Sequence, residues 1–204
     1  MPASDICFSL SVTRLSRQRL MGLNYLIALM MVALFIMARP SVLSATPLHE
    51  AARQNDIRAV HRLLITGMSV NIVRQEDGNT PLHVASARGH MQVLILLLKL
   101  GADVNVRNPD GLSPLHLAAY SGNAHAVSLL LDWGADISAQ DNIGATPLHI
   151  AALKDDELAV LVLMRRGADI TIRTKTGLRP IDYARAGGMT KNEAYSMLTG
   201  QTRR

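Results

Sequence analysis

A four-residue motif recurs along this chain at an almost constant interval, and that interval constrains the fold more than any other feature. Thr-Pro-Leu-His occupies Thr46–His49, and copies follow at Thr80–His83, Ser113–His116 and Thr146–His149, with a degenerate fifth at Arg179–Asp182. The steps between the copies are 34, 33, 33 and 33 residues. A fixed period of this length predicts a solenoid, in which each repeat packs on its neighbours and the array offers a long surface instead of one deep cleft.

Other positions repeat in register with the motif. Each copy is followed by small residues such as Ala118-Ala119, then by a leucine cluster such as Leu129–Leu131, and then by a glycine. The Thr or Ser is a good helix N-cap and the Pro suits the first helical position, so we expect a first helix of about ten residues. The leucines predict a second helix with a buried stripe, which the glycine ends in a left-handed conformation. An extended finger with a turn at Asp-Gly then leads to the next copy.

This combination of positions resembles the ankyrin repeat, and the resemblance covers residues 43–204. It implies an all-α solenoid of about five helix-turn-helix repeats, at about residues 43–76, 77–109, 110–142, 143–175 and 176–204. The first and last repeats carry polar residues where the middle repeats are apolar, which predicts that they cap the array. The longer first step predicts one extra residue within Ile72–Glu76, in the first finger.

Residues 1–45 differ in composition from the repeats at 46–204 and are predicted to form a separate segment. A basic stretch at 14–19 precedes Leu20–Ala38, which is 19 residues without a charge, and small residues follow at Ser41–Ala45. This order is typical of a signal peptide, although the apolar run also has the length of a membrane-spanning helix. A cleaved signal peptide and an uncleaved signal anchor are both open, and a buried helix of a soluble fold is a third alternative.

The charges around the apolar segment predict its orientation. Three arginines precede the segment and one follows it closely, which keeps the N-terminus in the cytoplasm and carries the repeats across the membrane. We therefore expect the array in a bacterial periplasm, either released after signal cleavage or anchored in the inner membrane. In both cases the membrane is contacted only through the N-terminal segment.

The whole chain has a net charge of +5, but the repeats are close to neutral. Four of the 21 basic residues and one of the 16 acidic residues precede Thr46, which leaves the repeats at +2. That charge is too small for the basic surface that nucleic-acid binding needs. The distribution is uneven, because Thr46–Met164 has 8 basic and 12 acidic residues whereas Arg165–Arg204 has 9 and 3. A partner of complementary polarity would be oriented on the array, and an ordinary solvated surface is the alternative.

Four of the seven histidines lie in the repeated motif, at His49, His83, His116 and His149. Equivalent residues of stacked helices lie about 8–10 Å apart, whereas each ligand of a zinc ion lies about 2 Å from it, so these histidines predict no metal site. We expect each imidazole to bond its own Thr or Ser hydroxyl and a backbone group of a neighbouring repeat. The sequence also has no glycine-rich phosphate loop, Gly-x-Ser-x-Gly elbow or Cys-x-x-Cys pair, so we expect no catalytic site, cofactor or small-molecule substrate.

Candidate binding residues lie where the repeats differ from one another. Tyr120 lies on the first helix of the third repeat and Trp133 lies just before Gly134, with partial packing as the alternative role for both aromatics. The finger tips complete the candidate surface, with Arg74, Glu76, Arg107, Asn108, Gln140, Asn142, Arg173 and Lys175. The ankyrin resemblance implies docking on fingers and first helices, so we expect a monomeric, non-catalytic scaffold for one protein partner. An immunity-type inhibitor of an envelope-acting toxin and a secreted effector acting in host cells are the alternatives.

Overall fold

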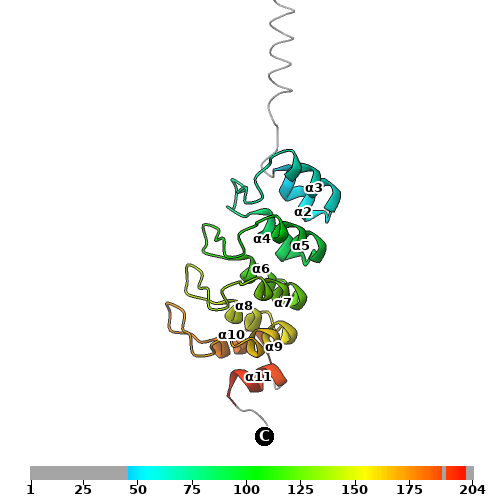
Figure 1. Ribbon diagram of the computed structural model, residues 1–204. Helices are drawn as coiled ribbons and strands as arrows, with labels where there is room; N and C mark the ends of the chain where they lie inside the picture. The colour runs from blue at the N-terminus through cyan, green and yellow to red at the C-terminus, as the bar shows by residue number, and fades with distance from the viewer. Residues whose placement is uncertain (1–45, 190–191, 201–204) are drawn as a thin grey trace, which may run out of the picture. The chain divides into compact units, whose positions relative to one another are not determined.

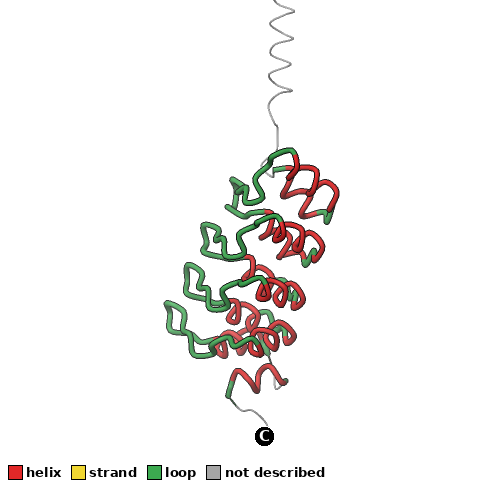
Figure 2. Tube along the Cα trace, viewed as in Figure 1, coloured by secondary structure: helices red, strands yellow, loops and turns green. Residues whose placement is uncertain are grey.

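The computed structural model describes residues 46–189 and 192–200, and every regular element in that part of the chain is an α-helix. The helices follow one another in five pairs along a stack (Figures 1 and 2). The pairs are α2 (Pro47–Arg53) with α3 (Ile57–Ile65), α4 (Pro81–Arg88) with α5 (Met91–Lys99), α6 (Pro114–Tyr120) with α7 (Ala124–Asp132), α8 (Pro147–Leu153) with α9 (Glu157–Arg165), and α10 (Pro180–Gly187) with α11 (Glu193–Leu198). The predicted all-α solenoid is confirmed for these residues.

The predicted N-terminal export or anchor segment precedes the helices of the stack in the sequence. The export or anchor helix predicted within residues 20–38 lies outside the described residues. Of the ten helices that the structure does describe, none combines the length and the apolar character that crossing a membrane requires.

Each first helix begins at the proline of the motif. In α4, Thr80 is the N-cap with an extended backbone and Pro81 is the first helical residue, where its missing N–H leaves nothing unpaired. The first helices are seven or eight residues long, shorter than the ten expected, because a residue with positive φ follows at a fixed place in every repeat. That place holds Asn55, Gly89, Gly122, Asp155 and Gly188, with φ between 54° and 88°.

The core runs through the stack and consists mainly of leucines and alanines. Leu82 of α4 and Leu97 of α5 are fully buried, and so are Leu115 and Leu130 in the next repeat. Burial of one leucine side chain stabilises a fold by about 1.5–3 kcal/mol relative to its exposure. The pair Ala118-Ala119 in α6 is also fully buried, and its small side chains let the first helices of neighbouring repeats pack closely.

A finger connects each second helix to the next first helix, and Figure 2 shows the fingers as loops on one side of the stack. The second helices end at glycines in the left-handed region, with φ of 87° at Gly101 and 84° at Gly134, as predicted. A backbone hydrogen bond then closes each finger; in the second finger the Asn108 N–H donates to the Leu112 carbonyl at 3.0 Å.

The first finger is longer than the others. Its closing bond runs from the Arg74 N–H to the Asn79 carbonyl at 2.9 Å and encloses one residue more than the equivalent bond of the second finger. The extra residue therefore lies between Arg74 and Asn79, which overlaps the range Ile72–Glu76 that the 34-residue step predicts.

Candidate functional site

The histidine of the motif bridges two repeats through its two ring nitrogens. His83 Nδ1 accepts a hydrogen bond from the Thr80 backbone N–H at 3.1 Å and lies 3.0 Å from the Thr80 hydroxyl. Its Nε2 lies 3.0 Å from the Leu112 carbonyl of the next repeat. Because a backbone N–H can only donate, Nδ1 is the acceptor and Nε2 carries the proton that it donates to the carbonyl. His116 and His149 make the same bonds, so the predicted tie between repeats is confirmed.

Burial keeps these rings neutral. Desolvation lowers the pKa of His83 from the ordinary 6.5 to about 4, and it lowers the pKa of His49, His116 and His149 as well. Hydrogen bonds occupy both nitrogens of each ring, so these histidines offer no free ligand atom. Within residues 46–189 and 192–200, no three His, Cys, Asp or Glu side chains are grouped so that they could hold a metal ion.

The fifth copy of the motif keeps half of this interaction. Asp182 replaces the histidine, and its carboxylate accepts the Arg179 backbone N–H at 2.9 Å. A carboxylate has no proton to donate, so Asp182 starts its helix but cannot tie it to a carbonyl of a following finger. The neighbouring Tyr183 packs edge-on against His149 with 5.1 Å between the ring centroids.

Several of the predicted finger residues bond one finger to the next. Arg107 donates from Nη1 to the Gln140 carbonyl at 2.5 Å, and Asn142 donates from Nδ2 to a carbonyl of the second finger at 2.7 Å. The Lys175 backbone N–H donates to the Ile143 carbonyl at 2.9 Å. These bonds fix the spacing of the fingers, so the remaining side-chain atoms of their tips are presented on a preorganised surface.

Asn108 differs from the other predicted contact residues because it is only 8% exposed. Its Oδ1 accepts two backbone N–H groups of its own finger, at 3.0 and 2.9 Å, and its Nδ2 donates to Asn79 Oδ1 of the first finger at 3.1 Å. The side chain therefore holds the turn and lies beneath the surface that a partner can reach. The sequence contained a signal for this role, because the same place in the next two fingers holds Asp141 and Thr174, whose oxygens also favour such turns.

The first and fourth fingers differ in charge. In the first, Arg74 is bonded to Asp77 and lies 3.7 Å from Glu76, and the Arg74 guanidinium lowers the pKa of Asp77 to about 2. Two carboxylates face one cation there. In the fourth finger Arg173 and Lys175 are both exposed.

The two aromatic candidates lie at opposite ends of one helix pair. Tyr120 is the last residue of α6, is 57% exposed, and has the Lys154 ammonium 4.6 Å from its ring centroid. Trp133 caps the C-terminal end of α7 and is 41% exposed. Because α6 and α7 run in opposite directions, the nine residues of α7 separate the two side chains by about 13 Å. The structure thus groups Tyr120 with the first helices and leaves Trp133 outside that group.

In the third to fifth repeats the first helices carry apolar side chains that are exposed, as Tyr120 and Leu153 are, or half-buried, as Leu117, Ile150 and Tyr183 are. We call this surface the first-helix row, and it consists of Leu117 and Tyr120 in α6, Ile150 and Leu153 in α8, and Tyr183 in α10. In α2 the corresponding places hold Glu50 and Arg53, an exposed ion pair at 2.6 Å. The solvent side of a surface helix is normally polar. The change from charged residues in α2 to apolar residues in α6 and α8 is therefore the feature of the sequence that could have predicted this surface.

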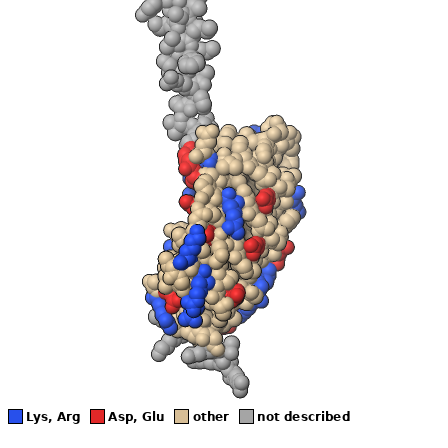
Figure 3. Space-filling model, turned by 90° about the vertical axis from the view of Figure 1, so that its left-hand side faces the viewer, with Lys and Arg blue, Asp and Glu red and all other residues tan. Residues whose placement is uncertain are grey.

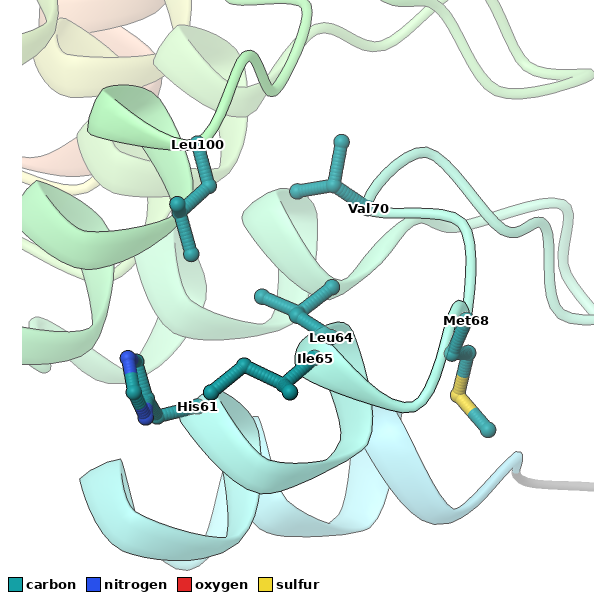
Figure 4. A pocket seen from close by; sticks show the side chains of 6 residues that line it. All are labelled: His61, Leu64, Ile65, Met68, Val70 and Leu100. Carbon is teal, nitrogen blue, oxygen red and sulfur yellow. The ribbon is translucent and has the colours of Figure 1, made fainter.

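Hollows lie beside the first repeat and beside this row. In the first repeat, Leu64 and Ile65 of α3 line a hollow with Leu100, which follows α5, and Figure 4 shows these side chains together with His61, Met68 and Val70. A second, more polar hollow lies at the turns of the third and fourth repeats, where it is lined by Tyr120, Ser121, Gly122, Lys154, Asp155, Asp156, Glu157 and Leu158.

The histidine bridges predict a loss of stability as the pH falls from about 6.5 to about 4. The pKa of His83 is lower in the folded chain than in the unfolded chain, so the unfolded state takes up the proton first and acid favours unfolding. For His83 alone the loss is on the order of 3 kcal/mol. Urea unfolding at pH 7 and pH 4 measures the difference.

A matched pair of variants isolates this contribution. His83→Gln removes the titrating ring, so its free energy of unfolding should change less with pH than that of the wild type, although it starts lower. His125→Gln alters an exposed histidine and should follow the wild type. The same pH dependence in all three proteins would contradict the assignment.

Comparisons with known proteins place this architecture in a family. The family described as "Ankyrin repeats (3 copies)" matches residues 24–108 and 100–174. The putative ankyrin repeat protein FPV240 of Fowlpox virus (strain NVSL) is 41% identical over 61 residues, which are 30% of this chain and 15% of that protein. Ankyrin repeat domain-containing protein 40 of Homo sapiens is 46% identical over 59 residues, which are 29% of this chain and 16% of that protein.

A third relative is a protein kinase, and its likeness to this chain is also confined to a short segment. The serine/threonine-protein kinase VIK of Arabidopsis thaliana is 46% identical over 57 residues, which are 28% of this chain and 13% of the kinase. The chain thus spans no more than 16% of the length of these three relatives, and the likeness concerns only that part of each of them. Because the family match covers most of the chain and agrees with the stacked helix pairs, this chain belongs to the ankyrin-repeat family.

Proposed function

We propose that this chain is a non-catalytic scaffold that holds one protein partner on its first-helix row and fingers. The observation that carries the proposal is the row itself, where Tyr120 is 57% and Leu153 is 41% exposed on well-packed helices. Aromatic and aliphatic anchors at the centre of an interface contribute most of the binding energy of protein complexes. Exposure of these apolar side chains to water does not stabilise the isolated chain, so their burial against a partner would be favourable.

The fingers support the same function because the bonds between them fix their positions. Arg107 and Asn142 each donate to a carbonyl of a neighbouring finger, at 2.5 and 2.7 Å. A partner that docks on fixed side chains loses less conformational entropy than one that must order a loop. The side chains of Arg173 and Lys175 supply exposed polar contacts at the rim.

The array is proposed to act on the periplasmic side of a bacterial inner membrane. The basic stretch at 14–19 before the uncharged segment Leu20–Ala38 supports export, with the array either released or anchored. The single cysteine, Cys7, precedes that segment, so no disulfide can form within residues 46–204 and the array needs none.

The row predicts which variants lose the partner. With the full chain as bait in an envelope extract, Tyr120→Ala with Leu153→Ala should reduce the amount of captured partner at least tenfold, because two anchors are lost. The matched control is Ile65→Ala with Leu100→Ala, which removes exposed apolar side chains from the hollow between the first and second repeats. Mass spectrometry of the captured proteins, with melting temperatures of all variants, gives the result. Equal loss in both double variants would contradict the proposed surface.

Export has its own test. Alkaline phosphatase fused after Arg204 requires an oxidising compartment for its disulfides, so the fusion should be active in cells if the repeats cross the membrane. Deletion of Leu20–Ala38 provides the control and should abolish the activity. An inactive fusion of the intact chain would contradict the periplasmic location. The mass of the purified protein then distinguishes a cleaved signal peptide from a retained anchor.

A further inference from the structure

The fourth finger carries cations that are not neutralised by neighbouring acids. Arg173 and Lys175 lie on this finger, and we call these two the finger-four cations. Arg179 follows the finger as the N-cap of α10, but it pairs with Asp182 at 3.8 Å and is not one of them. Arg173 donates one bond, from Nη1 to the Gly177 carbonyl at 2.8 Å, and a guanidinium has five N–H groups. Among residues 46–189 and 192–200, no carboxylate oxygen lies within 4.0 Å of Arg173 or Lys175. Figure 3 shows Lys and Arg side chains gathered towards this end of the face that the fingers present.

These cations adjoin the first-helix row. The fourth finger ends at Leu178, which is 44% exposed and whose carbonyl accepts the Nε2 bond of His149 at 3.2 Å. His149 lies in α8 directly before Ile150, a member of the row. A partner that covers Ile150 and Leu153 therefore has the base of the fourth finger beside it.

Acidic side chains lie at the other edges of this surface. In the first finger, Glu76 and Asp77 outnumber Arg74. At the turn between α8 and α9, on the other side of the row from the fingers, Asp155 and Glu157 line the hollow beside the row. The surface therefore has apolar side chains along its middle and cations on the side of the fourth finger. At the opposite turn, three acidic side chains outnumber the one cation, Lys154, that lies over the Tyr120 ring. Such a pattern favours one orientation of a bound partner.

We infer that this surface binds a protein segment with apolar side chains along one face and acidic side chains beside them, the acidic side lying against the finger-four cations. The inference rests on the proposed function and names the chemistry of the partner. Apolar side chains of the segment would remove Tyr120 and Leu153 from water. Carboxylates of the segment would form charge-assisted bonds with the Arg173 guanidinium, which matches carboxylate geometry, and with the Lys175 ammonium.

The same observations disfavour a nucleic acid or an anionic membrane as the ligand. A polyanion could use the finger-four cations, but its affinity depends on neutralising many charges at once, and the repeats carry only +2. Along the stack it would also meet the carboxylates of the first finger. A phosphate backbone would leave the apolar row uncovered.

Selection from a random peptide library tests the inference without knowledge of the natural partner. The immobilised full chain is used to select 16-residue peptides displayed on phage, in parallel with the variant Arg173→Glu with Lys175→Glu. The wild type should enrich peptides with an excess of Asp and Glu beside apolar residues at helical or alternating spacing. The charge-reversed variant should shift the excess towards Lys and Arg.

Affinities of the strongest synthetic peptide provide the quantitative arm. Its Kd should rise at least tenfold with Arg173→Glu and Lys175→Glu, and also with Tyr120→Ala and Leu153→Ala. The matched control, Arg58→Glu with Arg62→Glu, reverses two exposed cations on α3 and should leave the Kd within about twofold. If the double variant Arg173→Glu with Lys175→Glu unfolds, the single variant Lys175→Glu replaces it in the Kd measurement, because the Lys175 side chain is exposed.

Different outcomes would contradict the inferred partner chemistry and the proposed protein-binding function. Peptides without an acidic excess, or equal weakening by the α3 control, would overturn the inference while the protein-binding function stands. Tighter binding of phosphatidylglycerol vesicles or of a single-stranded oligonucleotide than of the selected peptide would also overturn it. Failure to select any peptide, together with failure to capture a protein from the envelope extract, would overturn both.

Discussion

The bond from a buried imidazole to the carbonyl of the next repeat is the interaction on which the rest of the structure depends. His83 Nε2 lies 3.0 Å from the Leu112 carbonyl, and Leu112 is the last residue of the second finger. The same ring receives the Thr80 N–H at the start of its own helix. One side chain therefore sets where a helix begins and where the following finger ends. Burial strengthens the hydrogen bond and disfavours the charged form of the ring. Loss of the bond would leave a buried polar group unpaired, which costs more free energy than one hydrogen bond contributes.

Repetition of this bond separates the residues that hold the fold from those that are available to a partner. The motif residues of the second to fourth repeats are buried, and even finger residues with long polar side chains are partly used between repeats, as Arg107 is. The side chains of Tyr120 and Leu153 remain largely exposed, although the Tyr120 ring is contacted by Lys154 of the next repeat. The first helices therefore bury one side for stability and present the other for recognition, and a charged pair in the first repeat shows that the exposed side tolerates polar residues.

The period and the motif predict the helix pairs, the left-handed glycines and the histidine ties, because each follows from local chemistry repeated in register. Positions at the surface are harder to predict, because exposure depends on how neighbouring repeats stack. Asn108 has the polar character of a contact residue, yet it lies inside its finger. Leu117 and Ile150 have the apolar character of core residues, yet they are only half-buried. Trp133 and Tyr120 are close in sequence, and only the antiparallel course of α6 and α7 separates them.

The protonation of the bridging rings tests this account most directly. Long-range nitrogen–proton correlation spectra of the ¹⁵N-labelled full chain report, for each histidine, which ring nitrogen carries the proton. At pH 7 the account predicts that His83, His116 and His149 are neutral, with the proton held on Nε2 and Nδ1 unprotonated. A charged ring, a proton on Nδ1, or rapid exchange between the two tautomers at these residues would show that the imidazole does not tie one repeat to the next.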